Sequence, residues 1–271
     1  MKNKKVLVIL IAIVFFVIAI ISFVALFSIK RVHVDFAVHK ETDSKEIQDS
    51  LDAFLGDNLL FLNLDKVDEV LDDYHYIEVV SVKKSFPNVL DVKLKERREI
   101  FYIKNGTSFI VTNEDGFVLN SVDCGDVLDN ISRDKIIVDL TGVNIIDHSL
   151  GDYLKTDNDA LVNSIFEMAK SVNLTDNINE ISVFTADGAE PDVKFNIVTG
   201  ATIIVQKVDV NNQTENQGKI KNAFFVYDTL LSDFEKFTGE ILSTKVNNPN
   251  DKYHGCFRVL YNGQERWTSD K

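Results

Sequence analysis

The segment from Ile77 to Lys95, IEVVSVKKSFPNVLDVKLK, carries the clearest secondary-structure signal in the chain. Its first half, 77–84, is rich in β-branched residues and predicts one strand. In its second half, 90–95, apolar and charged residues alternate, which is typical of a strand with one buried face. The Phe-Pro-Asn sequence around Pro87 lies between the halves and favours a turn. The segment therefore predicts a β-hairpin.

The residues before this hairpin predict one more strand and two helices. From Arg31 to Val38 apolar residues recur at every second position, as in a half-buried strand. Asp43 and Glu46 fit the start of a helix that ends near Gly56, and its apolar residues recur at helical spacing: Ile47, Leu51, Phe54 and Leu55. A shorter helix follows a capping residue, Asn63 or Asp65, and carries Val67, Val70 and Leu71. The predicted order is strand, helix, helix, strand, strand.

An apolar run of membrane-spanning length precedes these elements. Val6 to Phe27 is apolar except for Ser22, and as a helix it would extend roughly 33 Å at about 1.5 Å per residue. A cleaved signal peptide is the alternative, but its apolar region is shorter and ends in a small-x-small site. Here the run ends in the bulky residues 23–27. We therefore expect an uncleaved membrane anchor.

Charge separates the two sides of this anchor. The 271 residues contain 42 Asp and Glu against 29 Lys and Arg, and every acidic residue follows residue 31. Three lysines precede the apolar run and two basic residues follow it, a bias that favours a cytoplasmic N-terminus. A net charge of -13 repels phosphate backbones, so we expect no nucleic acid partner.

The motif inventory gives no catalytic, cofactor-binding or metal-binding residues. The five histidines are isolated, and Cys124 and Cys256 are too few for a disulfide-rich scaffold. The chain has no HExxH, GxSxG, SxxK, P-loop or GxGxxG motif. We therefore expect no enzyme, no cofactor and no small-molecule substrate. The many carboxylates still leave a membrane-anchored cell-wall hydrolase open as an alternative, because a glycosidase needs only two of them.

The predicted elements resemble a POTRA domain, specifically the membrane-proximal domain of the FtsQ/DivIB family of bacterial division proteins. The helix at 44–55 is similar to the first helix of that domain, and Gly56-Asp57-Asn58-Leu59-Leu60 is similar to its glycine-asparagine-leucine turn. Residues 82–90 resemble its basic, aromatic-proline hairpin, and Lys95-Glu96-Arg97 closes the pattern. His75 departs from it, since the family often has proline there.

The rest of the chain resembles the β-rich second domain of that family. Asn105-Gly106 predicts a hairpin between strands 100–104 and 107–112, followed by strands at 117–119, 136–143, 178–184, 193–198 and 201–208. Helices are predicted at 158–172 and from about Lys219 to Phe237. Two terminal strands would end at Gly263, and residues 209–218 read as a solvated loop.

The expected fold is thus α+β. We expect a cytoplasmic N-terminus at 1–5, a transmembrane helix at 6–29, and a POTRA domain of β-α-α-β-β order at 31–99. A β domain with flanking helices follows at 100–263, and a polar C-terminal tail at 264–271.

The resemblance implies a non-enzymatic scaffold that spans the cell membrane once, lies at the division septum and exposes its large domain outside the cytoplasm. Implied partners are FtsB/DivIC-like and FtsL-like membrane proteins and the septal wall synthase complex, through which the chain would help control septal peptidoglycan synthesis. An exported ligand sensor is a further alternative, but about five residues before the anchor are too few for an output domain.

The C-terminal strand is the candidate partner surface. Residues 256–261 alternate like a strand, and we expect nothing after them to pair with their outer edge. Trp267, the sole tryptophan, follows in a polar stretch. The family's last strand and the aromatic residues after it contact FtsB or DivIC, so the resemblance makes Phe257, Val259, Tyr261 and Trp267 the candidate partner-binding residues. The alternative is that Tyr261 closes the sheet's own core and Trp267 folds over it.

Overall fold

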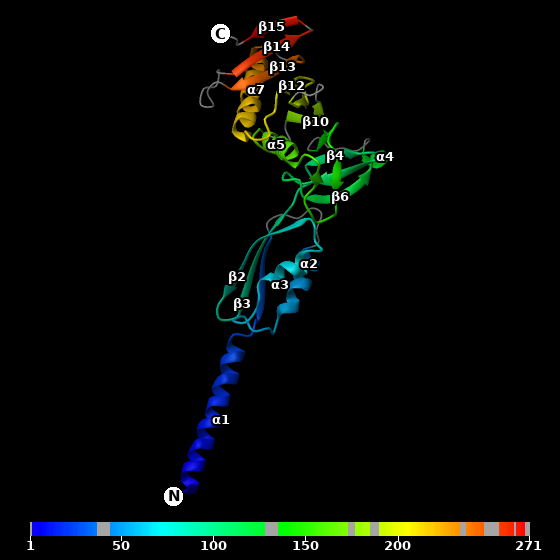
Figure 1. The fold of residues 1–271 in the computed structure, drawn as a ribbon. Coiled ribbons are helices and arrows are strands. Elements are labelled where there is room, and N and C mark those ends of the chain that lie inside the picture. The colour runs from blue at the N-terminus through cyan, green and yellow to red at the C-terminus, as the bar shows by residue number, and fades with distance from the viewer. Residues whose placement is uncertain are drawn as a thin grey trace. The chain divides into compact units, whose positions relative to one another are not determined.

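The fold is that of a computed structural model, which describes residues 2–36, 44–127, 135–172, 177–184, 190–233, 237–246, 255–262 and 264–268. The chain divides into two compact units, Met1–Arg97 and Arg98–Lys271 (Figure 1). The domain boundary expected after residue 99 therefore falls two residues earlier.

Helix α1, Lys2–Leu26, begins the first unit. Among the described residues it is the one helix long and apolar enough to cross a membrane, and its most apolar window is Ile9–Leu26. The transmembrane helix was expected to reach residue 29. It ends at Leu26 instead, because Ile29 leaves it and packs into the core of the first unit, where it is 2% exposed.

The remainder of the first unit has the expected β-α-α-β-β order. It comprises β1 (Arg31–Phe36), α2 (Ser44–Leu51), the short 3-10 helix η1 (Asp52–Phe54), α3 (Asp65–Leu71), β2 (Ile77–Ser85) and β3 (Val89–Glu96). Strand β3 is central, parallel to β1 and antiparallel to β2. The predicted N-cap Asp43 and the end of the predicted first strand, 37–38, lie outside the described residues.

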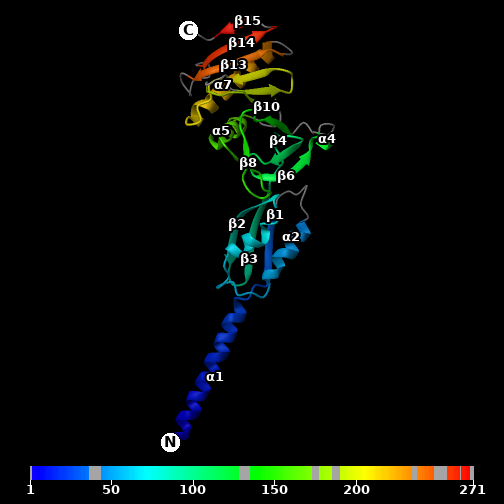
Figure 2. The same ribbon diagram turned by 45° about the vertical axis from the view of Figure 1, so that its right-hand side comes forward.

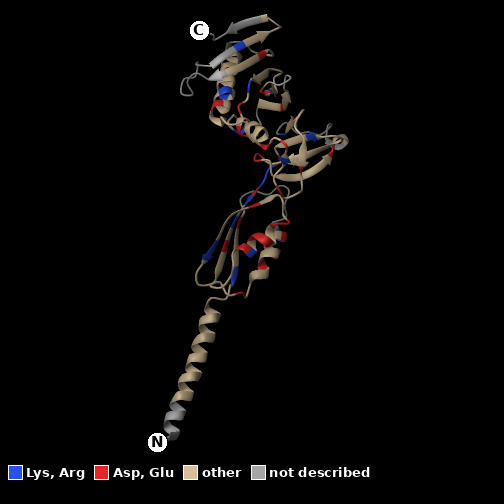
Figure 3. Cartoon of the chain, in the orientation of Figure 1, with Lys and Arg blue, Asp and Glu red and all other residues tan. Residues whose placement is uncertain are grey.

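The core of this unit follows the predicted apolar pattern. Ile47, Leu51 and Phe54 are buried, together with the inward-facing residues of β3. Leu55 was expected to belong to the same stripe but is 45% exposed, because the backbone becomes extended there (ψ 129°). Acidic residues outnumber lysines on α2 and α3, whereas the strands of this unit carry both signs of charge (Figure 3).

The second unit is built on a ten-stranded sheet with the strand order β15-β14-β13-β12-β11-β10-β7-β4-β5-β6. Its elements are β4 (Phe101–Asn105), β5 (Ser108–Thr112), β6 (Val118–Asp123), α4 (Cys124–Val127), β7 (Ile136–Asp139), β8 (Ile145–Asp147), β9 (Lys155–Thr156), α5 (Asp159–Lys170), β10 (Ile178–Phe184), β11 (Asp192–Ile197), β12 (Thr202–Val205), α7 (Gln213–Asp233), β13 (Glu240–Val246), β14 (Gly255–Tyr261) and β15 (Gln264–Thr268). Strands β8 and β9 form a separate two-stranded sheet.

Helices α5 and α7 pack against each other, and α7 lies against β12, β13 and β14 (Figures 1 and 2). One continuous core joins these helices to the sheet, from Phe101 on β4 to Val259 on β14. The predicted hairpin turn at Asn105-Gly106 is confirmed, and Gly106 adopts a positive φ of 61°. Cys124 is a half-buried free thiol.

Candidate partner interface and its support

The sheet continues one strand further than the sequence predicted. Residues 264–271 were expected to form a polar tail, but Gln264–Thr268 forms β15, antiparallel to β14. Asn262 precedes this strand with a positive φ of 53°, a conformation that asparagine tolerates. The sequence did not reveal the strand, because Trp267 is its only large apolar residue and no alternation results.

Strand β14 is therefore not an open edge. It pairs with β13 on one side, where Val259 lies opposite Ile241, and with β15 on the other, where Val259 lies opposite Trp267. The expectation that nothing follows residues 256–261 to pair with their outer edge is wrong. In the described part of the chain the outer edge of β15 is the one that no strand covers at this end of the sheet.

The four candidate partner-binding residues have different environments. Val259 is 2% exposed and belongs to the main core, so its side chain packs inside this unit and does not face a partner. Tyr261 is 38% exposed and stacks on the buried Phe237, with ring centroids 6.2 Å apart. The backbones of Phe257 and Trp267 lie in β14 and β15, and their side chains are outside the described part of the structure.

A βαβ unit supports this end of the sheet. Strand β12 is parallel to β13, and α7 is the crossover between them. The helix was expected to start near Lys219, but it starts at Gln213, within the predicted loop. Asn212 explains the earlier start: its Oδ1 accepts a hydrogen bond from the backbone N–H of Glu215 (3.2 Å), as an N-cap does. Its Nδ2 also donates to Glu215 Oε2 (3.0 Å).

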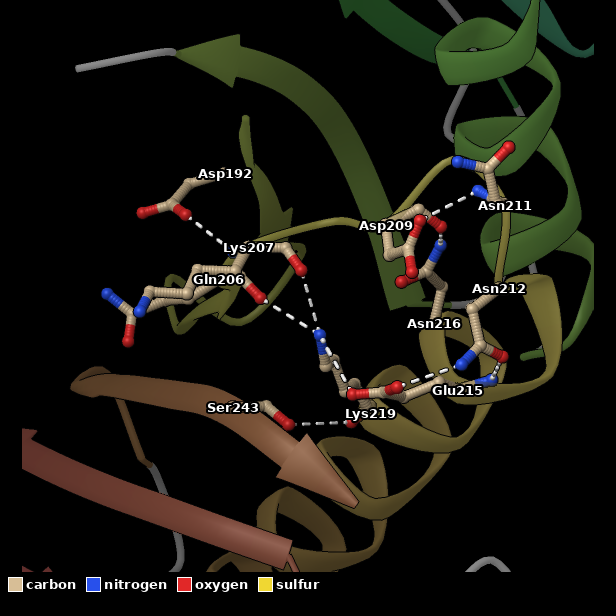
Figure 4. Close-up of polar contacts among 10 residues, drawn as sticks. All are labelled: Asp192, Gln206, Lys207, Asp209, Asn211, Asn212, Glu215, Asn216, Lys219 and Ser243. Carbon is tan, nitrogen blue, oxygen red and sulfur yellow. Dashed lines mark hydrogen bonds and ion pairs between the residues drawn. The ribbon is translucent and has the colours of Figure 1, made fainter. Parts of the chain in front are cut away.

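A buried lysine ties α7 to the chain beyond β12 (Figure 4). The side chain of Lys219 is 3% exposed. Its Nζ donates to the backbone carbonyls of Gln206 (3.2 Å) and Lys207 (2.9 Å) and lies 3.5 Å from Glu215 Oε1. A buried ammonium is tolerated only when acceptors replace its hydration, and these three groups do so.

The neighbouring residues hold the same segment in place (Figure 4). Lys207 has a positive φ of 51°, and its N–H donates to Asp192 Oδ1 (2.8 Å). Asn216 is fully buried, and its Nδ2 donates to the carbonyl of Asp209 (2.7 Å). Ser243, buried on β13, donates to the carbonyl of Lys219 (3.1 Å). We call Asn212, Glu215, Asn216, Lys219 and Ser243 the α7 polar cluster.

The α7 polar cluster fixes the helix against β12 and β13, and hence the strands that lead to the open edge. The sequence pattern does not reveal this cluster, because it marks Lys219 only as the start of a helix. The Asn-x-x-Glu spacing from Asn212 to Glu215 is the one signal that could have located the helix start.

A cell-wall hydrolase would need a cleft in which two carboxylates converge. One cleft, of about 390 Å³, lies beside α5 and is lined by Asp115 and Asp159 among others. Asp115 Oδ1 accepts from Lys170 Nζ (2.8 Å), while Asp159 Oδ1 accepts from the N–H (2.6 Å) and hydroxyl (2.9 Å) of Thr156. Both carboxylates are thus engaged in structural contacts. Within the described residues no group of three or more His, Cys, Asp or Glu could hold a metal ion.

Comparison with known proteins points to one family. The model of the FtsQ-type POTRA domain matches residues 27–97, which cover β1 to β3. Cell division protein DivIB of Clostridium acetobutylicum is 28% identical over 151 residues, or 56% of each chain. DivIB of Clostridium tetani is 23% identical over 207 residues, 70% of this chain and 74% of that protein.

A solved structure is also similar in part. It is the major extracytoplasmic domain of the trans isomer of the cell division protein DivIB from Geobacillus stearothermophilus, with 16% identity and a TM-score of 0.28 over 52% of this chain and 95% of that one. The β-α-α-β-β unit after an apolar helix, the FtsQ-type domain match and the DivIB relatives lead to one assignment. The chain thus carries an FtsQ-type POTRA domain at residues 27–97 and is similar to DivIB cell division proteins.

Proposed function

We propose that this chain is a non-enzymatic scaffold of the bacterial division machinery, held in the cell membrane by α1. In this role it binds other division proteins and helps control septal peptidoglycan synthesis. The similarity to DivIB proteins carries the proposal. The α1 helix supports it, because a single apolar span suits a protein anchored once in the membrane.

The proposed topology has the N-terminus in the cytoplasm and the chain from about Arg31 onward outside it, with the protein enriched at the septum. The three lysines in the first turn of α1, ahead of its apolar run, support this orientation. Protease added to intact spheroplasts should digest the 98–271 unit, and a fluorescent fusion should collect at midcell. Protection of this unit until the membrane is permeabilised would contradict the orientation.

The proposed partner surface is the outer edge of β15, extended by Tyr261, Phe257 and Trp267. An exposed strand edge offers unpaired backbone groups, and a partner's strand can add to it. The partners expected there are FtsB/DivIC-like and FtsL-like membrane proteins, which link the chain to the septal wall synthase complex. The α7 polar cluster supports this role, since strand addition requires an edge that is held in place.

Photo-crosslinking from the full-length protein in cells tests this surface. A photoreactive amino acid at Gln264, exposed on β15, should capture a membrane-anchored division protein. The same amino acid at Lys221, exposed on α7, is the matched control in the same unit and should not. Capture from position 221 without capture from position 264 would move the interface away from the β15 edge.

Substitution of Tyr261 separates binding from folding. Tyr261→Ala removes a half-exposed ring that also stacks on Phe237. We expect partner binding to weaken by about 1 kcal/mol or more, with a smaller change in thermal unfolding. A loss of stability with unchanged binding would assign Tyr261 to the core.

The proposal of a scaffold also predicts that purified full-length protein does not hydrolyse peptidoglycan. Hydrolysis that Asp115→Asn or Asp159→Asn abolishes would favour the cell-wall hydrolase instead, because these carboxylates line the cleft beside α5.

A further inference from the structure

The end of α1 is hydrogen-bonded to a loop of the domain that follows it. We call residues 55–61 the lower loop. Asn58 Nδ2 donates to the carbonyl of Val24 (3.2 Å), and the N–H of Leu59 donates to the carbonyl of Phe27 (2.8 Å). Val24 belongs to the apolar window that α1 offers to a membrane. The lower loop is therefore held within one helical turn of the membrane-spanning segment.

The tip of the β2–β3 hairpin reaches the same place. The N–H of Lys30 donates to the carbonyl of Asn88 (2.9 Å). The ring of Phe86 lies edge-on to that of Phe27 (6.0 Å between centroids), and Phe27 in turn contacts Phe23 on α1 (4.8 Å). Aromatic rings thus continue from the membrane helix to the hairpin tip without interruption.

The side chains presented here are apolar and open to solvent. Phe61 is 81% exposed, Phe86 58% and Leu55 45%. Apart from α1, the only other large apolar side chain described as exposed in this unit is Val80, on β2. Exposed aromatic side chains gathered in one place mark a contact with another apolar phase.

Two lysines and one acid lie beside this group of side chains. Lys84 Nζ donates to the carbonyl of Leu60 (3.2 Å), which places the ammonium beside the lower loop. Lys30 is exposed directly after the helix end, and Asp57 is the exposed acid of the lower loop. Phe and Leu side chains flanked by lysines are typical of segments that lie in the membrane–water interface, where the apolar side chains enter the acyl boundary and the ammonium groups meet lipid phosphates.

We propose that the lower loop and the hairpin tip insert into the interfacial layer of the membrane surface from which α1 emerges. Phe61, Phe86 and Leu55 enter the acyl-chain boundary, and the first unit is thereby held at the lipid surface by three points besides α1. The occupant is lipid, because a hydrogen bond fixes the lower loop to the helix that crosses the membrane. The hairpin tip is held four residues beyond the helix end, by the bond between Lys30 and Asn88. This inference depends on α1 spanning the membrane and not on the division role.

Depth-dependent quenching in nanodiscs tests the proposal on the full-length protein. Trp267→Phe removes the native emission, and a single tryptophan is then placed by Phe61→Trp or Phe86→Trp. Val80→Trp is the matched control: Val80 is 49% exposed, and it lies five residues, about 17 Å at roughly 3.3 Å per residue, up β2 from Ser85. The nanodiscs contain phosphatidylcholine and phosphatidylglycerol, with or without bromine on the upper part of the acyl chains.

Brominated lipid should reduce emission at positions 61 and 86 by about twofold, since interfacial side chains reach roughly 5–10 Å into the boundary layer. Emission at position 80 should stay unchanged. Quenching equal to that of the control would overturn the proposal. Blue-shifted emission without quenching at 61 and 86 would also overturn it, because a protein surface would then cover these side chains. The 81% exposure of Phe61 makes its variant safe for folding, and thermal unfolding of each variant checks this.

Discussion

The two units of the chain differ in what they bury. Every polar or charged side chain that is buried among the described residues lies in the second unit: Thr112, Asn113, Thr156, Ser164, Asn216, Lys219, Asn222 and Ser243. The buried side chains described in the first unit are all apolar, and its large exposed apolar residues outside α1, with the exception of Val80, lie on the lower loop and the hairpin tip. The first unit is therefore stabilised mainly by burial of apolar side chains. The second unit is stabilised also by buried polar groups that need particular hydrogen-bond partners.

This difference shows which kind of substitution each unit tolerates. An apolar core accepts changes that keep volume and pattern, whereas a buried polar group left without its partner costs its full desolvation. Substitution of polar residues should therefore affect the second unit far more than the first. Urea unfolding of full-length protein in detergent, followed by pulsed hydrogen exchange for peptides of each unit, measures the stability of the two units separately.

Substitution of Lys219 is expected to have the largest effect. Lys219→Ala leaves the carbonyls of Gln206 and Lys207 without their donor and Glu215 without its cation. We expect the second unit to lose about 4 kcal/mol of unfolding free energy. The first unit should be unaffected.

Lys221 provides the control for this change, since it lies on the same helix and is exposed. Lys221→Ala should alter the unfolding free energy by less than about 0.5 kcal/mol. If the two alanine variants were equally stable, the α7 polar cluster would not support the sheet.

The same difference explains how much the sequence could predict. In the first unit the spacing of Ile47, Leu51 and Phe54 and the Phe-Pro-Asn turn were sufficient, because local pattern and core burial agree there. In the second unit the start of α7 and strand β15 were missed. Tertiary partners stabilise both: Asn216 is buried by the fold around it, and β15 forms by pairing with β14. Apart from the Asn-x-x-Glu spacing at Asn212, the local sequence pattern does not reveal these contacts.

Substitution of one glycine in each unit should lower the unfolding free energy by less than Lys219→Ala does. Gly116 in the second unit and Gly56 in the first both have positive φ, 81° and 93°. A Cβ at Gly116 would lie 2.7 Å from the ring of Phe166, whereas a Cβ at Gly56 would meet nothing within 4 Å. Gly56→Ala should cost about 1 kcal/mol from backbone strain alone, and Gly116→Ala about 3 kcal/mol. Equal costs would show that packing around Phe166 relaxes freely.

Removal of the α7 cap should have a moderate effect. Asn212→Ala removes the acceptor of the Glu215 N–H and should destabilise the second unit by about 1 kcal/mol. Asn212→Asp retains a capping oxygen and should restore most of the loss. Hydrogen exchange should increase first in residues 213–218, the turn that sequence patterns assigned to a loop. Unchanged exchange there would assign the start of α7 to Asn216 and Lys219 instead.

The smallest difference in stability between the units is expected from ion pairs on the strands. In the first unit Lys95 lies 3.9 Å from Glu78, with both side chains largely exposed. In the second unit Lys104 on β4 donates to Asp139 Oδ2 on β7 (3.1 Å) and to Glu180 Oε1 on β10 (3.2 Å), which joins three strands. Although burial opposes the shift, the hydrogen bonds with Asp139 and Glu180 raise the pKa of Lys104.

The pKa of Asp139 shifts in the opposite direction. A hydrogen bond from the Thr141 hydroxyl (2.7 Å) and, against the effect of burial, the contact with Lys104 lower it below the ordinary aspartate value. The carboxylate therefore stabilises the fold above the unfolded-state pKa of about 4, and this contribution disappears as the pH falls through the lower folded-state pKa.

Asp139→Asn should accordingly destabilise the second unit at pH 7 by only about 0.5 kcal/mol, since the side chain is one-third exposed and solvent screens the pair. Below about pH 4 the difference from the unsubstituted protein should shrink, because protonation then removes the same charge. Glu78→Gln in the first unit should have no measurable effect at either pH, because its pair is longer and more exposed. A pH-independent loss for Asp139→Asn would mean that hydrogen-bond geometry at Thr141, and not the charge shared with Lys104, is what Asp139 contributes to the sheet.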